Sequence, residues 1–351
     1  MLRSAIVGCG VIGPHHANCY KQTQEIRLAA VVDIVPERAK KLAAAHGVPW
    51  HTDVREVLKR KDIDVIDVCV PSGLHGRVAI AAARAGKHCL SEKPLDVTPQ
   101  RCDQIIRAFK KSGTTLGGIY QHRFADDSGR AKAAIEAGRL GRVTLATCST
   151  PWWRTQEYYD SGDWRGTWKL DGGGCLMNQG IHAIDLLVWL VGSIKSIQAR
   201  TALLGHERIE VEDVAVATVE FTSGALGVIQ GTTTAFPEAA VRHEIMGTDG
   251  MIYLEGDKAT LWQLRDEIEA GKTGAVSAVP AAGAATHWSN LSSDIFVRCI
   301  DNFARAVREG KPPLVTGEEH KKAVEIICAI YQSARTGKPV KLPLKQFRPK
   351  V

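Results

Sequence analysis

The residues best suited to move a proton lie in two clusters that are far apart along the chain. The first, Glu92-Lys93-Pro94, follows a short apolar run that ends at Leu90. Pro94 disfavours a helical conformation at Lys93. A positive neighbour together with desolvation would lower the pKa of a lysine toward the range of general acid–base chemistry. Spacing alone leaves open the alternative of a surface lysine before a turn.

The second cluster begins at three consecutive glycines, residues 172–174, and continues into an apolar segment that predicts a helix over 176–190. Asn178, His182 and Asp185 stand at i, i+4 and i+7, so they share one face of that helix. A polar stripe on an apolar helix must be satisfied or functional, and histidine exchanges protons near neutral pH. A hydrogen-bonded core histidine is the competing interpretation. No metal-ligand spacing is present, so we expect no metal.

A glycine-rich turn close to the N-terminus fits the pattern G-x-G-x-x-G. Gly8, Gly10 and Gly13 follow an apolar strand, and Val11 and Ile12 open the helix that comes next. The first glycine permits a tight turn, the second lets a pyrophosphate approach the backbone, and the third lets helix and strand pack closely. The helix N-terminus offers free N–H groups and a positive dipole to phosphates. The sequence therefore predicts a dinucleotide site.

Asp33 supports that prediction and selects the cofactor. It stands twenty residues after Gly13 (33 − 13 = 20), where a ribose-binding carboxylate is expected. A carboxylate accepts from the 2′-hydroxyl of NAD and repels the 2′-phosphate of NADP. The next residue is Ile34, and Arg38 lies further on, so we expect NAD. The alternative is a glycine turn with Asp33 as a helix cap.

The chain up to residue 121 alternates short apolar runs with helical patterns. Strands are predicted at 2–7, 27–32, 64–70, 88–90 and 115–120, and helices at 12–22, 36–46, 74–85 and from 98 onward. Such alternation is typical of a doubly wound parallel sheet. We therefore expect an α/β Rossmann domain over 1–121.

Beyond residue 121 several long strands follow one another without intervening helices. Helices are predicted at 127–137, 176–190, 291–309 and 317–336, strands at 142–150, 194–202, 213–221, 225–234, 241–247 and 251–255, and a loop at 265–290. Turn signals at Ser223-Gly224 and Asp249-Gly250 favour hairpins. We expect an α+β domain over 122–351 with a mostly antiparallel, open-faced sheet, for substrate binding and oligomerisation. Its last helices are able to pack back on the first domain.

Composition narrows the class of protein. The chain has 351 residues, is 44% hydrophobic and 24% charged, and carries a formal net charge of +7. Its basic residues are scattered, so we expect no nucleic-acid partner. No apolar run is long enough for a membrane helix and no signal segment precedes the first strand. The 9 cysteines are irregularly spaced. They favour free thiols in a reducing compartment, the cytoplasm.

Together the motifs resemble the Gfo/Idh/MocA (glucose–fructose oxidoreductase / inositol dehydrogenase) family. The matching segments run in the family's order over most of the chain: Gly8 to Gly13, 71–75, 85–88, 92–94, 121–124 and 172–185. The resemblance implies a Rossmann domain with an open-faced sheet domain, NAD as cofactor, and a homo-oligomer, dimer or tetramer. It also implies that Lys93 and His182 form the acid–base pair.

One position departs from the inositol-dehydrogenase pattern, which has Asp four residues before the histidine. Here Asn178 stands there, and an amide can orient a hydroxyl but cannot act as a base. The run 177–182, with 164–168 before it, is similar to the branch of sugar-nucleotide 3-dehydrogenases that act on UDP-N-acetylglucosaminuronate.

The remaining site residues rest on the resemblance or on their residue type. Expected to bind the cofactor, besides the glycine turn, Asp33 and Lys93, are Pro71, Ser72, His75, Glu92, Gln121, Trp164 and Arg165. Expected to bind the substrate are Arg123, Trp153, Arg154, Tyr159, Asn178 and Asp185. For the aromatic residues, core packing or a subunit interface is an equally open interpretation.

These patterns predict an NAD-dependent oxidoreductase that moves a hydride between nicotinamide and a secondary alcohol carbon of a sugar or sugar nucleotide. His182 or Lys93 would take the hydroxyl proton while the other steadies the oxygen. Three alternatives stay open. The first is a free-sugar, glycoside or inositol dehydrogenase. The second is an NAD-dependent glycosidase that uses transient oxidation, and the third is a non-catalytic dinucleotide-binding regulator.

Overall fold

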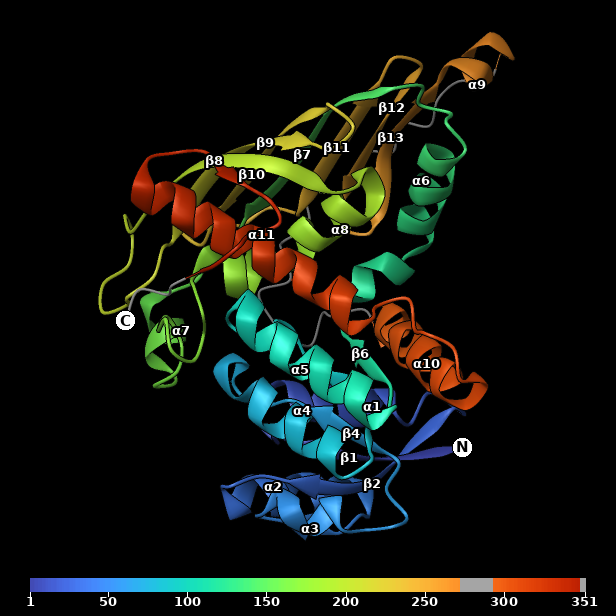
Figure 1. Cartoon of the computed structure of the whole chain (residues 1–351), viewed down its shortest axis with the longest axis vertical. Coiled ribbons are helices and arrows are strands. Elements are labelled where there is room, and N and C mark those ends of the chain that lie inside the picture. The colour runs from blue at the N-terminus through green and yellow to red at the C-terminus, as the bar shows by residue number, and fades with distance from the viewer. Residues whose placement is uncertain (272–292, 348–351) are drawn as a thin grey trace. The chain divides into compact units, whose positions relative to one another are not determined.

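The computed structural model describes residues 1–271 and 293–347 (Figure 1). The chain forms two compact units. The first comprises Met1–Gln121 with helix α10 (Ser293–Glu309) and the start of α11 (Gly317–Thr336) up to Lys321; the second starts at His122 and takes in α11 from Lys322. Within the described residues, no helix is long and apolar enough to span a bilayer.

The first unit is built on a parallel sheet with the strand order β3-β2-β1-β4-β5-β6, counting the described residues. The strands are β1 (Leu2–Val7), β2 (Ile26–Val32), β3 (Trp50–His51), β4 (Val65–Val68), β5 (His88–Ser91) and β6 (Leu116–Gly118). Every pairing is parallel. The central strand β4 is buried along its whole length, because helices cover both faces of such a sheet. This is the expected doubly wound fold.

Besides α10 and the start of α11, the helices of this unit lie between its strands along the chain. They are α1 (Ile12–Cys19), α2 (Pro36–His46), α3 (Val54–Leu58), η1 (Ser72–Leu74), α4 (His75–Arg84) and α5 (Pro99–Ser112). The Thr98 hydroxyl accepts from the N–H of Arg101 at 3.3 Å and caps α5, and Gly113 ends it with φ 71°. The short elements β3 and α3 were not predicted, because two strand residues and one helical turn carry no readable period.

The second unit contains a mixed sheet with the order β13-β12-β11-β7-β10-β9-β8-β14 among the described residues. The strands are β7 (Val143–Pro151), β8 (Ile194–Ala202), β9 (Val214–Phe221), β10 (Leu226–Thr232), β11 (Arg242–Gly247), β12 (Gly250–Glu255), β13 (Lys258–Leu264) and β14 (Val340–Lys341). Only the β7–β10 pair is parallel among the pairings of these strands. The mostly antiparallel sheet was predicted; β13 and β14 were not.

One face of this sheet is covered by helices, and its strands alternate accordingly. Helix α8 (Ile181–Val191) lies against β7 and β11 (Figure 1). The opposite face carries exposed apolar side chains on neighbouring strands, Leu145, Val216 and Leu226. The sheet is therefore open on one side, as expected. Helices α6 (Asp126–Glu136) and α7 (Gln156–Asp160) complete the unit's described connections before α8.

The segment 265–290, expected to be a loop, starts with a helix. Residues Arg265–Glu269 form α9, whose first turn contains Asp266 and Glu267, favourable charges at a helix N-terminus. A helix of five residues is too short to show a readable helical period, so the sequence pattern did not reveal it. The remainder of that predicted loop, from residue 272, lies outside the described residues.

Candidate active site

The glycine-rich turn between β1 and α1 has the geometry that a dinucleotide requires. Gly8 has φ 104°, and a side chain there would overlap the carbonyl of Cys69, the residue that follows the neighbouring strand β4. A side chain at Gly13 would overlap the carbonyl of Gly8, so this glycine allows α1 to start close to β1. A side chain at Gly10 would meet open space. The backbone is therefore accessible where a pyrophosphate would approach the start of α1.

Asp33 follows β2 and is tied to this turn. Its Oδ2 accepts from the N–H of Cys9 at 2.7 Å and its Oδ1 accepts from the N–H of Val35 at 2.8 Å. Each carboxylate oxygen keeps a further lone pair, so both can accept from ribose hydroxyls. The residues present fit an NAD molecule with its pyrophosphate at Gly10 and its adenosine ribose at Asp33.

Two residues expected beside the cofactor, after β4 and on α4, are buried. Ser72 is buried in η1, and His75 is 1% exposed. The two ring nitrogens of His75 lie 2.6 Å from the Pro94 carbonyl and 2.8 Å from the Val70 carbonyl. His75 thus connects the end of β4 with the residue after Lys93. Its predicted contact with the cofactor stays a prediction, and the geometry favours a positioning role.

Lys93 follows β5 and is anchored by its neighbour. The N–H of Lys93 donates to Oε2 of Glu92 at 2.9 Å. Burial alone would raise the pKa of Glu92, but hydrogen bonding to His16 and the charges of His16 and Lys93 lower it. Glu92 is therefore ionised near neutral pH. Gln121, which ends the first of the two segments of this unit, is also buried.

The predicted helix 176–190 is two elements. A π-helix, η3 (Cys175–Gly180), precedes α8. Asn178 lies in the π-helix, whereas His182 and Asp185 lie on α8; that the three side chains share one face stays a prediction. The Asn178 amide donates to Asp171 at 2.6 Å and accepts from Gln179 at 3.2 Å. Such π turns occur frequently at functional sites.

A buried carboxylate that sequence reasoning missed holds the start of this element. Glu212 accepts from the N–H groups of Gly174 (2.9 Å) and Leu176 (3.0 Å), and from the hydroxyl of Tyr331 (2.8 Å). Burial raises its pKa to about 7, although these hydrogen bonds lower it. A side chain at Gly174 would overlap the carbonyl of Glu212. Because Gly174 has no side chain, the backbone before η3 can pass close to Glu212, which lies just before β9.

His182, half-buried on the first turn of α8, has a histidine neighbour. The rings of His182 and His122 pack edge to face with centroids 5.2 Å apart. Nδ1 of His122 lies 2.6 Å from Oδ1 of Asp257. Burial alone would lower the pKa of His122, but Asp257 raises it. Sequence reasoning missed this pair, because Asp257 lies in a turn between β12 and β13 and carries no motif.

Arg123 and Asp185 form a buried pair within the second unit. Nε and Nη2 of Arg123 donate to the two carboxylate oxygens of Asp185 at 2.9 and 2.6 Å. The side chains are 2% and 3% exposed. The bidentate geometry favours a structural role in fixing α8, and the predicted substrate contacts of both residues stay predictions.

Aromatic side chains pack against two arginines, Arg165 and Arg154. The Arg165 guanidinium lies over the rings of Tyr158 (4.2 Å) and Trp164 (4.7 Å), and donates to the Tyr158 hydroxyl. Arg154 pairs with Glu238 at 3.0 Å and donates to Gln179. Gln179 in turn donates to the Tyr158 hydroxyl at 2.9 Å. The two arginines and η3 therefore belong to one network.

Two other residues predicted to bind the substrate, Tyr159 and Trp153, contact side chains of the protein itself. Tyr159 is buried, and its hydroxyl lies 2.9 Å from that of Thr233. The Trp153 ring packs against Phe236 and His206. Packing, the interpretation that the sequence left open, is favoured for Tyr159.

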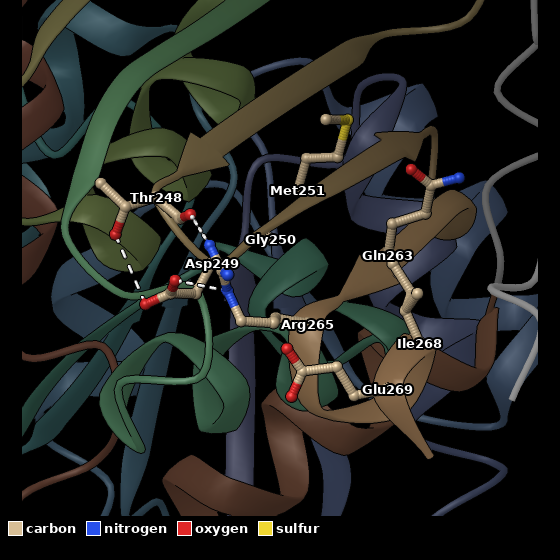
Figure 2. A pocket seen from close by; sticks show the side chains of 8 residues that line it. All are labelled: Thr248, Asp249, Gly250, Met251, Gln263, Arg265, Ile268 and Glu269. Carbon is tan, nitrogen blue, oxygen red and sulfur yellow. Dashed lines mark hydrogen bonds and ion pairs between the residues drawn. The ribbon is translucent and has the colours of Figure 1, made fainter. Parts of the chain in front are cut away.

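A cavity of about 280 Å³ lies at the ends of β12 and β13 beside α9 (Figure 2). Arg265 pairs with Asp249 at 2.8 Å and donates to the Thr248 carbonyl at 3.1 Å. None of the predicted site residues lines it. Thr248, Asp249 and Arg265 are engaged with one another (Figure 2), and the cavity is separate from the residues described above.

Among the described residues, one group of side chains brings potential ligand atoms within 4.8 Å of one another: His16, Asp67 and Cys69. Both ring nitrogens of His16 face carboxylate oxygens at hydrogen-bond distance. We therefore treat the group as a hydrogen-bonded network. That the protein needs no metal stays a prediction.

Two family models match the chain. The NAD-binding Rossmann model of the GFO/IDH/MocA oxidoreductases covers residues 2–120, and a GFO/IDH/MocA C-terminal domain model covers residues 129–253. The first match confirms the predicted NAD-binding Rossmann domain.

Similar proteins include a solved structure and two curated relatives. The WlbA dehydrogenase from Bordetella pertussis, in complex with NADH and UDP-GlcNAcA, is 32% identical, with a TM-score of 0.85 over 98% of this chain and 99% of that one. The scyllo-inositol 2-dehydrogenase (NAD(+)) of Bacillus subtilis (strain 168) is 28% identical over 98% of this chain and 97% of its own length. The D-glucoside 3-dehydrogenase of Escherichia coli (strain K12) is 27% identical over 97% of each chain.

Proposed function

Because this chain belongs to the Gfo/Idh/MocA family of NAD-dependent oxidoreductases, we propose that it oxidises a secondary alcohol of a sugar nucleotide, at C3 of a UDP-sugar. Relatives across this family act on sugars, inositols and UDP-sugars. The observation that carries the proposal is the likeness to the UDP-GlcNAcA-bound WlbA dehydrogenase over 98% of the chain. The sequence has Lys93 and His182, the pair that the family resemblance implies.

The first unit would hold the cofactor. The backbone at Gly10, with the N-terminal turn of α1, would bind the pyrophosphate, and Asp33 the adenosine ribose. Four further predicted contacts follow the C-terminal ends of strands in this sheet: Pro71, Ser72, Glu92 and Gln121. The predicted contacts from the second unit are Trp164 and Arg165. NAD, when bound, accepts the hydride that the sugar carbon gives up.

Two side chains would handle the proton. The Nζ of Lys93 or a ring nitrogen of His182 takes the hydroxyl proton, and the other group stabilises the charge that develops on the oxygen. The Asn178 amide orients the hydroxyl and takes no proton, since an amide is not a base. Asp171 and Gln179 hold that amide in place.

The arginine and aromatic network of the second unit supports an anionic substrate. The Arg165 guanidinium lies over two aromatic rings and donates to the Tyr158 hydroxyl, and among the described residues no ion pair with a carboxylate holds it. Arg154 lies over Trp152 and Tyr158. Guanidinium groups bind phosphates and carboxylates well, which suits a sugar nucleotide. The exposed apolar residues on the open sheet face support a homo-oligomer.

A substrate panel tests the proposal. UDP-sugars, UDP-uronates, methyl glycosides, inositols and free sugars are each incubated with NAD⁺, and NADH is followed by its absorbance. We expect the highest kcat/KM with a UDP-sugar, and product analysis should locate the new ketone at C3. The B. subtilis and E. coli relatives favour a second candidate, an inositol or glycoside as substrate. Turnover of these alone would establish that candidate and refute the nucleotide requirement.

A further inference from the structure

We propose that His16 is a positioning residue for Lys93. Held between Asp67 and Glu92, it carries a positive charge that offsets the charge of Glu92 and so sets the pH range over which Lys93 exchanges its proton. This inference rests on the proposed function, because it assigns a partner to the lysine of that reaction. His16 has no place in the predicted site.

The network joins three elements of the first unit. Nδ1 of His16 lies 2.8 Å from Oδ2 of Asp67, and Nε2 lies 2.9 Å from Oε1 of Glu92. Asp67 also accepts from the hydroxyl of Tyr20 at 2.7 Å. The other oxygen of Glu92 accepts from the N–H of Lys93. A continuous chain of hydrogen bonds therefore runs from β4, through α1, to the backbone of Lys93.

The local sequence explains how a histidine reaches this place. His16 stands on α1, three residues after Gly13, where helix and strand approach closely because Gly13 has no side chain. Asp67 interrupts the apolar run of β4, and Glu92 directly follows β5, the strand paired with β4. His16 and Asp67 are 0% exposed. A buried acid in a central strand needs a partner, and His16 supplies it.

The charges follow from the donors and acceptors. A neutral imidazole has one N–H, whereas two carboxylate oxygens face the two nitrogens of His16, so the doubly protonated ring satisfies both. Burial alone would lower the pKa of His16, but Asp67 and Cys69 raise it well above its ordinary range. With the pKa of Glu92 lowered, the triad of one imidazolium and two carboxylates keeps one net negative charge. Such a buried charge stabilises a positive neighbour, here the Lys93 ammonium.

The groups that face His16 from each neighbouring element are few. On α1 they are Tyr20, hydrogen-bonded to Ser4 of β1, and His15 and Cys19. From β4 and the residue after it come Asp67 and Cys69, and from the end of β5 come Glu92 and Lys93. On α10 the ring of Phe296, which carries no charge, packs edge to face at 4.8 Å.

Loss of the imidazolium would leave Glu92 uncompensated next to Lys93. The lysine would then hold its proton to higher pH. Loss of the Glu92 charge has the opposite effect. This pair of opposite signs holds whether the reaction needs Lys93 neutral as the base or charged as the stabiliser of the oxygen. A histidine that only packs would give no such pair.

The experiment compares pH profiles of kcat and kcat/KM for four forms of the full-length enzyme. These are wild type, His16→Gln, Glu92→Gln and the control His88→Gln. Glutamine keeps a donor near the position of Nε2 and removes the charge. His88, at the start of β5, accepts from the N–H of Thr115 at 3.0 Å and lies outside the network. NADH fluorescence and thermal unfolding verify that each form is folded and binds cofactor.

We expect the limb governed by Lys93 to move up by about one pH unit in His16→Gln, a rate change of about tenfold on that limb, and down in Glu92→Gln. His88→Gln should match wild type. Limbs that stay within a few tenths of a unit of wild type in His16→Gln, or that move the same way in both variants, would overturn the inference. If His16→Gln does not fold, His16→Asn replaces it, because that amide also removes the imidazolium charge and predicts the same upward movement.

The outcome is separable from failure of the proposed function. If no sugar is oxidised, or if Lys93→Ala retains wild-type turnover, the proposed function is wrong and no Lys93 limb exists. If Lys93→Ala is inactive and the His16→Gln profile equals that of wild type, only the role of His16 is refuted.

Discussion

Two buried glutamates, one in each unit, are held in opposite ways. Glu92 faces His16 and neighbours Lys93, and these positive groups lower its pKa although burial alone would raise it. Among the described residues, Glu212 accepts from backbone N–H groups and a tyrosine hydroxyl, so burial prevails and raises its pKa to about 7. The difference teaches that partners decide the state of a buried acid. In the first unit the ionised Glu92 lies beside Lys93, the predicted proton carrier. In the second unit the Glu212 carboxyl group binds backbone N–H groups and so fixes the start of η3.

The largest effect that would sharpen this comparison is expected at Lys93. Lys93→Ala should lower kcat by about 10²–10⁴-fold, the usual contribution of a general acid–base group. The control is Lys110→Ala, which removes an exposed lysine paired with Glu318 on the same unit. Equal turnover by both variants would show that Lys93 does not transfer the proton, and the charged Glu92 would then have no catalytic neighbour.

Removal of one partner from the buried Arg123–Asp185 pair should destabilise the second unit strongly. Arg123→Gln leaves the Asp185 carboxylate without its bidentate partner, and such losses cost about 3–5 kcal/mol. Chemical denaturation measures the loss. The exposed Arg242–Glu255 pair offers the control Arg242→Gln, with an expected cost below about 1 kcal/mol. Similar small costs for both variants would show that burial does not make the loss of one charged partner more destabilising in this unit.

The raised pKa of Glu212 gives a signed pH dependence. The unfolded carboxyl group titrates near 4.5 and the folded one near 7, so the native state binds the extra proton between these values. The free energy of unfolding therefore falls as pH rises from about 4.5 to about 7, by at most about 3 kcal/mol from this group. In Glu212→Gln this part of the slope should vanish.

Urea unfolding at about pH 5 and about pH 8 measures that slope. Glu210→Gln is the matched control, since Glu210 is exposed and lies two residues away. A Glu212→Gln slope equal to that of wild type would mean that Glu212 is ionised in the folded state, and the contrast with Glu92 would disappear.

The smallest expected effect concerns the cofactor. Asp33→Ala removes the acceptor expected to bind the ribose hydroxyls and should weaken NADH binding by about 10–100-fold, the value of one or two charge-assisted hydrogen bonds. Fluorescence titration measures the affinity. Asp53, an exposed helix cap that accepts from Arg55, provides the control Asp53→Ala. Unchanged affinity in Asp33→Ala would place the ribose elsewhere.

Local patterns made the nucleotide half readable. The turn from Gly8 to Gly13 and the cap at Thr98 depend on residues next to each other in the chain, so the sequence predicts them directly. The positions of His16, Asp67 and Glu212 depend on partners from distant segments, and each looks like an ordinary polar residue in an apolar run. The π turn at Cys175–Gly180 was also missed, because its apolar and polar residues suit an α-helix equally well.

Pairing between Lys93 and His182 is the central claim, and a double variant tests it most directly. Two groups that act on one hydroxyl behave as a unit, so their losses are not multiplicative. With the best substrate from the panel and saturating NAD⁺, the initial rate of NADH formation should fall about 10²–10⁴-fold in Lys93→Ala and in His182→Ala. The double variant should be about as slow as the slower single variant. Losses that multiply, or single variants with near wild-type rates, would contradict the account.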